Sequence, residues 1–221
     1  MAKQALIVGL GQFGVALARS LTARGMEVLA VDRSPELVQA VSGFVAEAVS
    51  FDAADELALA RTTPERRDLC VVAIGNEARD ASIVCTALLR QMGAPKIVAR
   101  ASDPIHERIL KLVGANEVVN PEQAFGERLA ARLAYSGVLD QLALGDDLIL
   151  TELQPPAKLV GRTLVEAALP RRFGVTVVAI RRLEQGRGRV SVPEPTVPIR
   201  AEDILVLVAA PEAVARMLDR L

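Results

Sequence analysis

Residues 5–14 read ALIVGLGQFG, a short apolar run followed by a glycine-rich hexapeptide. Apolar residues then recur at helical spacing over Gln12–Ala23, so the hexapeptide connects a predicted strand to a predicted helix. At such a connection the first glycine permits a tight turn, the second lets the backbone approach a pyrophosphate, and the third allows close helix–strand packing. The N–H groups and dipole of the helix N-terminus attract the anion. The sequence therefore predicts a phosphate-binding loop made by Gly9, Gly11, Gln12, Phe13 and Gly14.

A carboxylate, Asp32, follows the second predicted strand, Val28–Val31. In dinucleotide-binding folds an acidic residue at this place accepts hydrogen bonds from the ribose hydroxyls and repels a 2′-phosphate. We therefore expect a nucleotide with free ribose hydroxyls, which disfavours NADP. Arg33 comes next, and it either softens that repulsion or lies over the adenine.

Two further loops are expected to face the same crevice, because ligands of such folds bind at the carboxyl ends of the strands. In the first loop, Asp52 either accepts from the adenine amino group or caps the next helix, a role for which Asp55 competes. In the second, small residues allow close approach of the ligand. Arg100, at the end of the fifth predicted strand, either supplies a cation to phosphate or forms a surface ion pair. The site residues expected in these segments are Asp52, Ala53, Ala73, Ile74, Gly75, Asn76 and Arg100.

Short β-branched runs alternate with helical patterns through residues 1–120. This alternation predicts βαβ units and a parallel sheet, and right-handed crossovers then give an α/β, Rossmann-like, doubly wound arrangement. The expected strands are Ala5–Val8, Val28–Val31, Ala46–Phe51, Leu69–Ile74, Lys96–Ala99 and Glu117–Val119. The expected helices are Gln12–Ala23, Pro35–Val41, Asp55–Ala60, Ala78–Met92 and Asp103–Val113.

A further helix is expected from Pro121 to about Tyr135, with Glu122 in its first turn. The pattern changes after Gly137, so we place a nucleotide-binding domain at residues 1–137 and a small α+β domain at residues 138–221. A domain of that size is often stabilised by dimerisation. Its expected strands are Leu148–Leu153, Thr176–Ile180, Val190–Val192 and Asp203–Val208, its helices Thr163–Ala168 and Pro211–Leu221, and a turn falls at Gln185–Gly188.

Charge and composition narrow the class of protein. The formal net charge is −1, whereas nucleic-acid-binding proteins favour a basic face, and the chain has no Trp and one Tyr to stack on bases. We expect no nucleic-acid partner. No apolar run approaches the roughly 18 to 20 residues that span a bilayer, and the N-terminus lacks the pattern of a signal peptide. Cys70 and Cys85 lie outside any CxxC or Cys/His cluster, which predicts two buried thiols in a cytoplasmic protein.

Groups for catalysis are scarce. The chain has one histidine, His106, which we expect on the surface beside the apolar face of its helix rather than in a catalytic role. Arg171-Arg172 and Arg181-Arg182 form basic pairs with no nucleophile–base constellation nearby. No Walker lysine follows the glycines, so ATP hydrolysis has no support. We therefore expect no catalytic residues, because a nucleotide site alone does not make an enzyme.

Together these segments resemble the regulator-of-K⁺-conductance (RCK) family, of the type found in bacterial Trk and Ktr potassium-uptake regulators. The matching segments are Ile7–Gly14, Val31-Asp32, Val72–Asn76, Val113–Asn116 and Val119–Glu122 in the first half, and Leu159–Leu164, Phe173–Val175, Val178–Arg181 and Ala201–Leu205 in the second, the TrkA-C-like half. The resemblance covers nearly the whole chain, and two halves in the same order are more specific than the glycines.

The resemblance implies a regulatory subunit. Members dimerise through the helix that corresponds to Pro121–Tyr135, and the dimers assemble into an octameric ring on the cytoplasmic face of a separate membrane K⁺ channel or transporter subunit. Exchange of ATP against ADP, or of NADH against NAD, changes the ring and gates the ion path through differential affinity for its two shapes. Carried over by position, the nucleotide site consists of Gly9, Gly11, Gly14, Asp32, Arg33, Asp52, Ala73, Gly75 and Arg100.

Three details of the resemblance concern ligands. Glu122 corresponds to a carboxylate that binds a cation at the dimer interface of some Ktr relatives; a symmetric pair would favour Mg²⁺ or Ca²⁺, and the alternative is a first-turn Glu that interacts with the helix dipole. At Gln12, ATP-sensing members often carry Arg, so the choice between ATP, ADP and NAD(H) stays open. Where relatives bind cyclic di-AMP, a basic contact is replaced by Pro170, with Arg171 one place on.

Two other functions share part of this pattern. A small NAD-dependent oxidoreductase carries the same glycine fingerprint, but it needs a general acid or base beside the nicotinamide. A redox-sensing repressor needs a DNA-reading helix and a basic face, and neither is recognisable in the sequence. The RCK-type regulator is the leading hypothesis because it accounts for both halves of the chain.

Overall fold

The computed structural model describes residues 2–145, 147–184 and 187–221, which form two compact units, Met1–Pro121 and Glu122–Leu221. The sequence placed the division later, between residues 137 and 138. It lies earlier because helix α6 (Pro121–Ala134) packs with the second unit. Arg128 of α6 pairs with Asp140 of strand β7 (Val138–Ala143), and Tyr135, just after α6, packs against the core of that unit.

The first unit is built on a parallel six-stranded sheet in the order β3-β2-β1-β4-β5-β6. The direction of the strand order reverses between β1 and β4, which is the arrangement of a doubly wound fold. The predicted fold class is therefore confirmed, and all six expected strands are present with small shifts at their ends. The strands are β1 (Gln4–Val8), β2 (Glu27–Asp32), β3 (Glu47–Ser50), β4 (Leu69–Val72), β5 (Ile97–Arg100) and β6 (Glu117–Val119).

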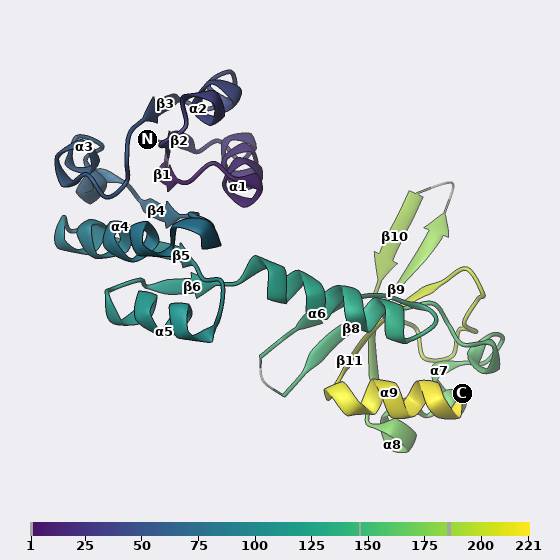
Figure 1. Cartoon of the computed structure of the whole chain (residues 1–221). Helices are drawn as coiled ribbons and strands as arrows, with labels where there is room; N and C mark the ends of the chain where they lie inside the picture. Colours follow the sequence, from purple (N-terminus) through teal and green to yellow (C-terminus); the bar gives the residue numbers. More distant parts are fainter. Residues whose placement is uncertain (1, 146, 185–186) are drawn as a thin grey trace. The chain divides into compact units, whose positions relative to one another are not determined.

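Helices cover both faces of this sheet (Figure 1). They are α1 (Gln12–Ala23), α2 (Pro35–Val41), α3 (Glu56–Ala60), α4 (Arg79–Gln91) and α5 (Pro104–Leu112). Successive strand residues point to opposite faces. In β1, Leu6 joins the core cluster that contains Leu89 of α4, whereas Ile7 joins the cluster that contains Ala18 of α1. Burial on both faces explains why the central strands, such as β1 and β2, contain continuous apolar runs rather than alternating residues.

The second unit is an antiparallel five-stranded sheet in the order β10-β9-β11-β8-β7. Its core includes Leu153, Phe173 and Leu205, together with Val214 and Met217 of the closing helix α9 (Pro211–Arg220). Besides α6, α9 and β7, its elements are β8 (Ile149–Leu153), α7 (Leu164–Ala167), α8 (Leu169–Phe173), β9 (Thr176–Glu184), β10 (Arg187–Ser191) and β11 (Ile204–Ala209).

Several elements of the second unit differ from the sequence-based expectation. Strand β7 was not expected, and a register shift between Val138 and Asp140 breaks the two-residue period that would have indicated it. Helix α8, which has five residues, was not expected. Strand β9 extends four residues beyond Ile180, to Glu184. The turn expected at Gln185–Gly188 falls partly on residues 185–186, outside the described residues, and Gly188 belongs to β10.

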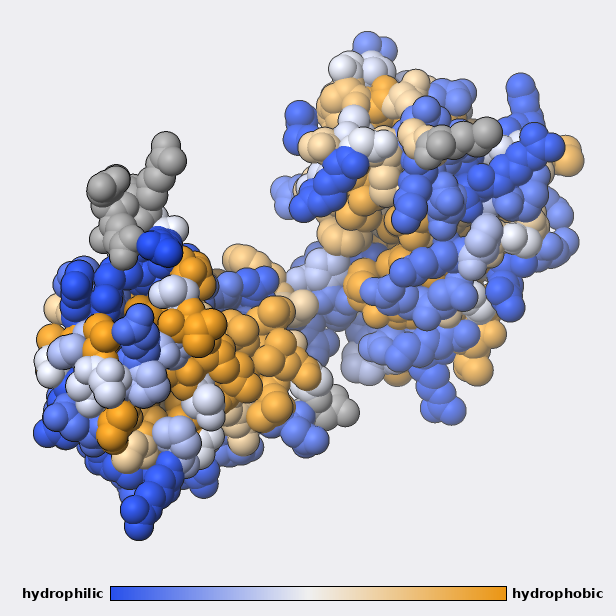
Figure 2. All heavy atoms as spheres, turned by 180° about the vertical axis from the view of Figure 1, so that it is seen from behind, coloured by the Kyte–Doolittle hydropathy of each residue, from blue (hydrophilic) through white to orange (hydrophobic). Residues whose placement is uncertain are grey.

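Large apolar side chains remain exposed on the second unit. Phe125 and Leu133 of α6 are 66% and 74% exposed, and Leu142 of β7 and Val178 of β9 are exposed as well. Figure 2 shows a broad hydrophobic area on this unit, at the left of the view. Exposed apolar patches of this kind mark protein–protein contacts. Among the described residues, no helix is both long enough and apolar enough to cross a bilayer.

Candidate nucleotide-binding site

The glycine loop connects β1 to α1, at the carboxyl edge of the sheet. Gly9 has φ of +100°, and a Cβ on it would lie 2.8 Å from the backbone nitrogen of Ile74. A Cβ on Gly14 would collide with the carbonyl oxygen of Gly9. These two glycines therefore let the loop lie against the end of β4 and let α1 pack on the loop. Gly11 differs, because a Cβ there meets nothing within 4 Å.

The N-terminus of α1 is suited to an anion. Gly11 is the N-cap residue, no side chain caps the helix, and no acidic residue lies in its first turn. The first backbone N–H groups of a helix have no intrahelical acceptor, and the helix dipole places partial positive charge beside them. The open space beside Gly11 thus lies where these donors are available, which is the arrangement that a pyrophosphate requires.

Asp32 is joined to the glycine loop by hydrogen bonds. Its Oδ2 accepts from the backbone N–H of Leu10 at 2.7 Å, and its Oδ1 accepts from the N–H of Ser34 at 2.9 Å. A carboxylate offers about four acceptor positions, so both oxygens retain capacity for ribose hydroxyls. Asp32 therefore holds the end of β2 against the loop while remaining able to accept from a ligand.

The loop after β4 and the end of β5 lie at the same edge of the sheet as the glycine loop. Ala73 is buried, and its N–H donates to the carbonyl of Val8 at 2.7 Å, which fixes this loop against β1. The guanidinium carbon of Arg100 lies 6.0 Å from the centre of the Phe13 ring. Its Nη1 would be 3.8 Å from a Cβ on Gly75. Arg100 thus brings a positive charge between the glycine loop and the loop after β4.

The remaining predicted site residues make fewer contacts with the glycine loop, Asp32 and Arg100. Asp52 is exposed, and its Oδ1 accepts from the N–H of Ala54 in its own loop. Asp55, not Asp52, caps α3. Arg33 and Asn76 are exposed at their strand ends, whereas Ala53 is buried in the core, 7% exposed. The structure thus brings together Gly9, Gly11, Phe13, Gly14, Asp32, Ala73, Ile74, Gly75 and Arg100, with exposed Gln12 opening α1 beside them.

The expectation for His106 is wrong. The residue was placed on the surface, but it is 1% exposed. Its backbone N–H donates to the N-cap carboxylate of Asp103 at 2.9 Å, and its Nδ1 lies 3.4 Å from the backbone nitrogen of Ser102. Burial, followed by the nearby charge of Arg79, lowers the pKa of His106 below its usual value. The apolar periodicity missed this position because the ring packs at the helix N-terminus, beside the capping turn.

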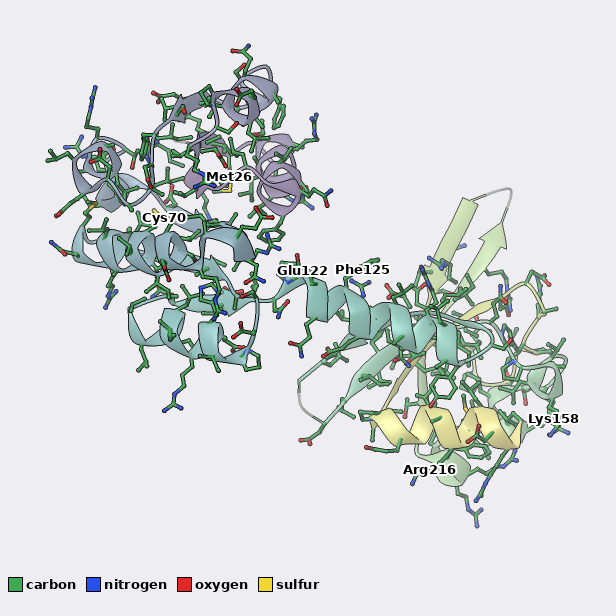
Figure 3. The ribbon with its side chains drawn as sticks, in the orientation of Figure 1. Met26, Cys70, Glu122, Phe125, Lys158 and Arg216 are labelled. Carbon is green, nitrogen blue, oxygen red and sulfur yellow. The ribbon has the colours of Figure 1, made fainter. Side chains whose placement is uncertain are left out.

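The two cysteines are buried thiols, as predicted. Both are fully buried and free, and Cys70 lies within the first unit (Figure 3). Burial raises the pKa of Cys70 and of Cys85 to about 12. Since the thiolate is the reactive form, neither thiol is suited to nucleophilic or redox chemistry in the folded protein.

One of the basic pairs in the second unit is neutralised by carboxylates. Arg182 donates two hydrogen bonds of 2.7 Å to Asp203, which is completely buried. Burial acts to raise the pKa of Asp203, but the hydrogen bond from Arg182 helps to outweigh it, and the pKa lies below its usual value. Arg181 pairs with Glu152 at 2.8 Å. These two arginines therefore support the sheet.

Glu122 lies exposed in the first turn of α6 (Figure 3). Within the described part of the chain, no group of three or more His, Cys, Asp or Glu side chains could hold a metal ion. Divalent cations such as Mg²⁺ and Ca²⁺ take six or more oxygen ligands. Glu122 of one chain thus supplies a single carboxylate, and a cation site there needs further oxygens from another molecule.

Sequence reasoning missed the link between Arg79 and Asp103. Arg79 opens α4, and Asp103 caps α5, and their Nη1 and Oδ2 atoms are 2.9 Å apart. Asp103 was expected only as the first residue of a helix, and Arg79 carried no signal because a single Arg near the start of a helix is common. Their separation by 24 positions makes the contact visible only in the folded chain.

Comparison with known proteins identifies both halves. A TrkA-N domain matches residues 5–121 and a TrkA-C domain matches residues 148–221. The Ktr system potassium uptake protein C of Bacillus subtilis is 31% identical over 220 residues, covering 100% of this chain and 98% of the relative. The Ktr system potassium uptake protein A of Vibrio alginolyticus is 30% identical over 219 residues, covering 99% of this chain and 98% of the relative.

The solved structure of the GsuK channel bound to NAD matches with a TM-score of 0.68 at 19% identity. It covers 97% of this chain and 38% of that one, so the present chain spans well under half the length of the GsuK chain, and the likeness bears on the fold alone. The order of the two domains and the full-length identity agree with the resemblance seen in the sequence. The chain belongs to the family of Ktr and Trk potassium uptake proteins, in which a TrkA-N domain precedes a TrkA-C domain.

Proposed function

We propose that this chain is the nucleotide-sensing regulatory subunit of a membrane K⁺ uptake system. The single observation that carries the proposal is that the glycine loop, Asp32 and Arg100 meet at the carboxyl edge of the sheet. The Ktr potassium uptake proteins that match along the full chain supply the K⁺ context. In this role the nucleotide is a signal rather than a substrate.

The proposed ligand is an adenine nucleotide, either ADP or ATP, or NAD or NADH. Its phosphates would lie over Gly11 at the N-terminus of α1, with Arg100 as a second positive charge. Asp32 would accept from the ribose hydroxyls, and Arg33, Asp52 and Ala53 would border the adenosine. Gln12 offers the phosphates a neutral donor, which gives a weaker hydrogen bond than a charged one. GsuK, which shares the fold, has been solved with NAD.

An enzymatic role has less support. Hydride transfer needs an acid or base beside the nicotinamide. The one histidine of the chain is buried at the N-terminus of α5, with its Nδ1 directed to Ser102. The alternative of a small NAD-dependent oxidoreductase is therefore not favoured by any side chain of the proposed site.

The proposed assembly is a homodimer that forms an octameric ring on the cytoplasmic face of a membrane K⁺ channel or transporter subunit. The exposed apolar side chains of α6, Phe125 and Leu133, support a contact between copies through this helix. The ring would change shape because one nucleotide binds one of its shapes more tightly than the other. No nucleic acid is involved.

In such a dimer, the two copies of Glu122 would be related by symmetry. A symmetric pair of carboxylates would favour Mg²⁺ or Ca²⁺. The alternative role of Glu122, an interaction with the dipole of α6, needs no cation. Calorimetric titration of the dimer with each cation, with Glu122→Gln as the comparison, separates the two roles, because only the first predicts binding that the variant loses.

Isothermal titration calorimetry tests the ligand. ADP, ATP, NAD, NADH and cyclic di-AMP are titrated into the full chain, after any nucleotide that co-purifies has been removed and identified. We expect at least one of ADP, ATP, NAD and NADH to bind. NADP should not bind, because Asp32 would repel its 2′-phosphate. If none of those four binds, the proposed function is wrong. Consumption of NADH that depends on a second substrate would instead favour the oxidoreductase.

Reconstitution tests the partner. The Trk- or Ktr-type membrane subunit of the same organism is placed in liposomes, and K⁺ uptake is measured with and without this chain and with each nucleotide in turn. We expect uptake to depend on the chain and to change when one nucleotide replaces another. Uptake that is the same with every nucleotide, although the nucleotides bind, would contradict the sensing role.

A further inference from the structure

Two segments beside the proposed nucleotide site are joined by an ion pair. Arg79 opens α4 shortly after the loop that contains Gly75, and Asp103 caps α5 three residues after Arg100. The guanidinium of Arg79 contacts both oxygens of Asp103, with Nη1–Oδ2 at 2.9 Å and Nη2–Oδ1 at 3.4 Å. The position of Asp103 therefore affects how closely Arg100 and Gly75 approach each other.

Asp103 is in turn held by the residues around His106. Its Oδ1 accepts from the backbone N–H of His106 at 2.9 Å. The backbone N–H of Ser102 donates to His106 Nδ1 at 3.4 Å, and the Ser102 hydroxyl lies 3.2 Å from the same nitrogen. Since Nδ1 accepts from a backbone N–H, the neutral ring carries its proton on Nε2. The ring thus fixes the turn that presents the Asp103 carboxylate.

The ring of His106 is poorly placed to carry a charge. It is 1% exposed, and its Nε2 is buried with no hydrogen-bond partner in the described part of the chain. A proton on Nδ1 would face the Ser102 N–H, so that backbone donor would lose its acceptor. The imidazolium would also be buried, and Asp103 is the group in the described part of the chain that favours the charged ring.

Two charged groups in the described part of the chain, Arg79 and Asp103, shift the pKa of His106. Arg79 of α4 disfavours the imidazolium, and Asp103 before α5 favours it, but burial and Arg79 together lower the pKa of His106. Two carboxylates on α5 and β6 are paired with lysines. Glu107 of α5 is 2.6 Å from Lys111, and Glu117 of β6, which packs on α5, is 3.4 Å from Lys96.

We propose that His106 is a pH-sensitive positioning residue for the nucleotide site: the neutral ring holds Ser102 and Asp103, Asp103 holds Arg79, and protonation releases this linkage so that nucleotide affinity falls as the pH falls. The inference rests on the proposed nucleotide site. His106 does not contact the ligand itself; it acts through Asp103 and Arg79 on the two segments that do. A K⁺ uptake system regulated in this way would respond to internal acidification as well as to nucleotide.

Thermodynamic linkage between proton binding and nucleotide binding determines the direction of the pH effect. If the nucleotide binds the state with neutral His106, bound nucleotide must lower the pKa of the ring further, and protons must weaken nucleotide binding. For one proton the loss of affinity is at most about tenfold per pH unit. Below the pKa of His106, the ligand-free protein carries a proton on the ring. Nucleotide binding at such a pH should therefore release about one proton.

The histidine ring can be observed directly, because the chain has only one. In protein without a histidine tag, the NMR signal of the ring Cε1–H belongs to His106 without further assignment. It is titrated from pH 8 to pH 5, with and without saturating ADP, and with NAD if ADP does not bind. We expect the midpoint to move to lower pH when nucleotide is present. An unchanged midpoint, with nucleotide bound throughout, would overturn the inference.

Calorimetry of variants supplies the second measurement. His106→Asn keeps an acceptor for the Ser102 N–H but does not titrate, so its affinity should stay within a few-fold from pH 7.5 to pH 5.5, while the affinity of the native chain falls by several-fold. Arg79→Gln should lower affinity already at pH 7.5, because it breaks the linkage at every pH. Arg108→Gln, on the exposed side of the same helix, is the matched control and should behave as the native chain.

The outcomes separate this inference from the proposed function. Absence of nucleotide binding at pH 7.5 would overturn the proposed function and this inference together. Binding at pH 7.5 with the same pH dependence in the native chain and in His106→Asn would overturn this inference alone. If His106→Asn does not fold, the NMR titration of the native chain decides by itself.

Discussion

The carboxylate of Asp32 accepts a hydrogen bond from the backbone N–H of Leu10, inside the glycine loop, with 2.7 Å between Oδ2 and N. Its Oδ1 accepts from the N–H of Ser34 at 2.9 Å. The residue that the sequence singled out for the ribose therefore also supports the phosphate loop. The contact with the loop stabilises the fold, whereas the proposed contact with the ribose would stabilise the complex.

Asp32→Ala should lower both the stability of the chain and its affinity for nucleotide. Loss of the charged acceptor should weaken adenine-nucleotide binding by about 1–3 kcal/mol, roughly 5- to 150-fold. The two backbone donors also lose their partner, so the free energy of unfolding should fall by about 1–3 kcal/mol. Calorimetry and urea denaturation measure the two effects. Asp52→Ala, at an exposed carboxylate, is the control. Unchanged affinity in Asp32→Ala would mean that the ribose is held elsewhere.

Gly11→Ala should lower nucleotide affinity, whereas Gly14→Ala should lower the stability of the fold. A Cβ at Gly11 meets no atom within 4 Å, and its φ of −65° suits any residue, so the variant should fold with native stability. The added methyl occupies the space proposed for phosphate, and nucleotide affinity should fall at least tenfold. A Cβ at Gly14 collides with the carbonyl oxygen of Gly9, so that variant should be destabilised by several kcal/mol. Thermal unfolding and calorimetry test the pair; native affinity in Gly11→Ala would place the phosphates elsewhere.

Gln12→Arg should increase affinity for ATP more than for ADP. Gln12 is exposed at the first position of α1, beside the proposed phosphate position. A charged donor makes a hydrogen bond about twice as strong as a neutral one. The ratio of the ADP and ATP dissociation constants should therefore rise several-fold in the variant. Gln12→Lys brings the same charge without the fork of donors, and an equal rise there would show that charge alone is sufficient. A ratio that does not change would mean that residue 12 does not approach the γ-phosphate.

The first unit was largely predictable because its sequence signals are local. The central strands of a sheet that is buried on both faces contain continuous apolar runs, and Gly9, Gly14 and Asp32 lie at fixed distances along the chain from β1 and β2. The fold class and the group of loops at the carboxyl edge follow from these spacings. Arg100 could be placed at the same edge because it ends β5.

The remaining contacts depend on tertiary packing. His106 lies beside an apolar face in sequence, and its burial depends on the tertiary packing of α5, which contacts both α4 and β6. The Arg79–Asp103 pair joins residues on two helices, and neither has a sequence signal for the other. In the second unit, the register shift in β7 removes the period that sequence analysis relies on.

The pH dependence of stability should carry the signature of His106. Its pKa is lowered in the folded chain, mainly by burial, so the unfolded chain binds more protons between that value and about 6.5. The free energy of unfolding should therefore be highest above pH 6.5 and decrease as the pH falls below it, by at most about 1.4 kcal/mol per pH unit. Urea denaturation from pH 7.5 to pH 5.5 measures this slope. His106→Asn should show a smaller slope; an equal slope would assign it to other groups.

The Arg182–Asp203 pair should contribute more to stability than the Arg181–Glu152 pair beside it. Asp203 is fully buried, whereas the side chains of Arg181 and Glu152 are 37% and 30% exposed. Arg182→Met leaves a buried carboxylate without its cation and should cost about 3–5 kcal/mol at pH 7. Arg181→Met, the matched control, should cost less than about 1 kcal/mol because its pair is screened by solvent.

The pH dependence of Arg182→Met gives an independent check. The pKa of Asp203 is below its usual value in the native chain, so the stability that it contributes is present above about pH 4 and is lost as the pH falls through the lower, folded value. Without Arg182, burial would raise that pKa, and the carboxyl would protonate more easily. The loss of free energy of unfolding in Arg182→Met, relative to the native chain, should therefore become smaller as the pH falls from 7 to 4. A loss that is constant over this range, or equal to that of Arg181→Met, would mean that the buried charge of Asp203 is not the cause.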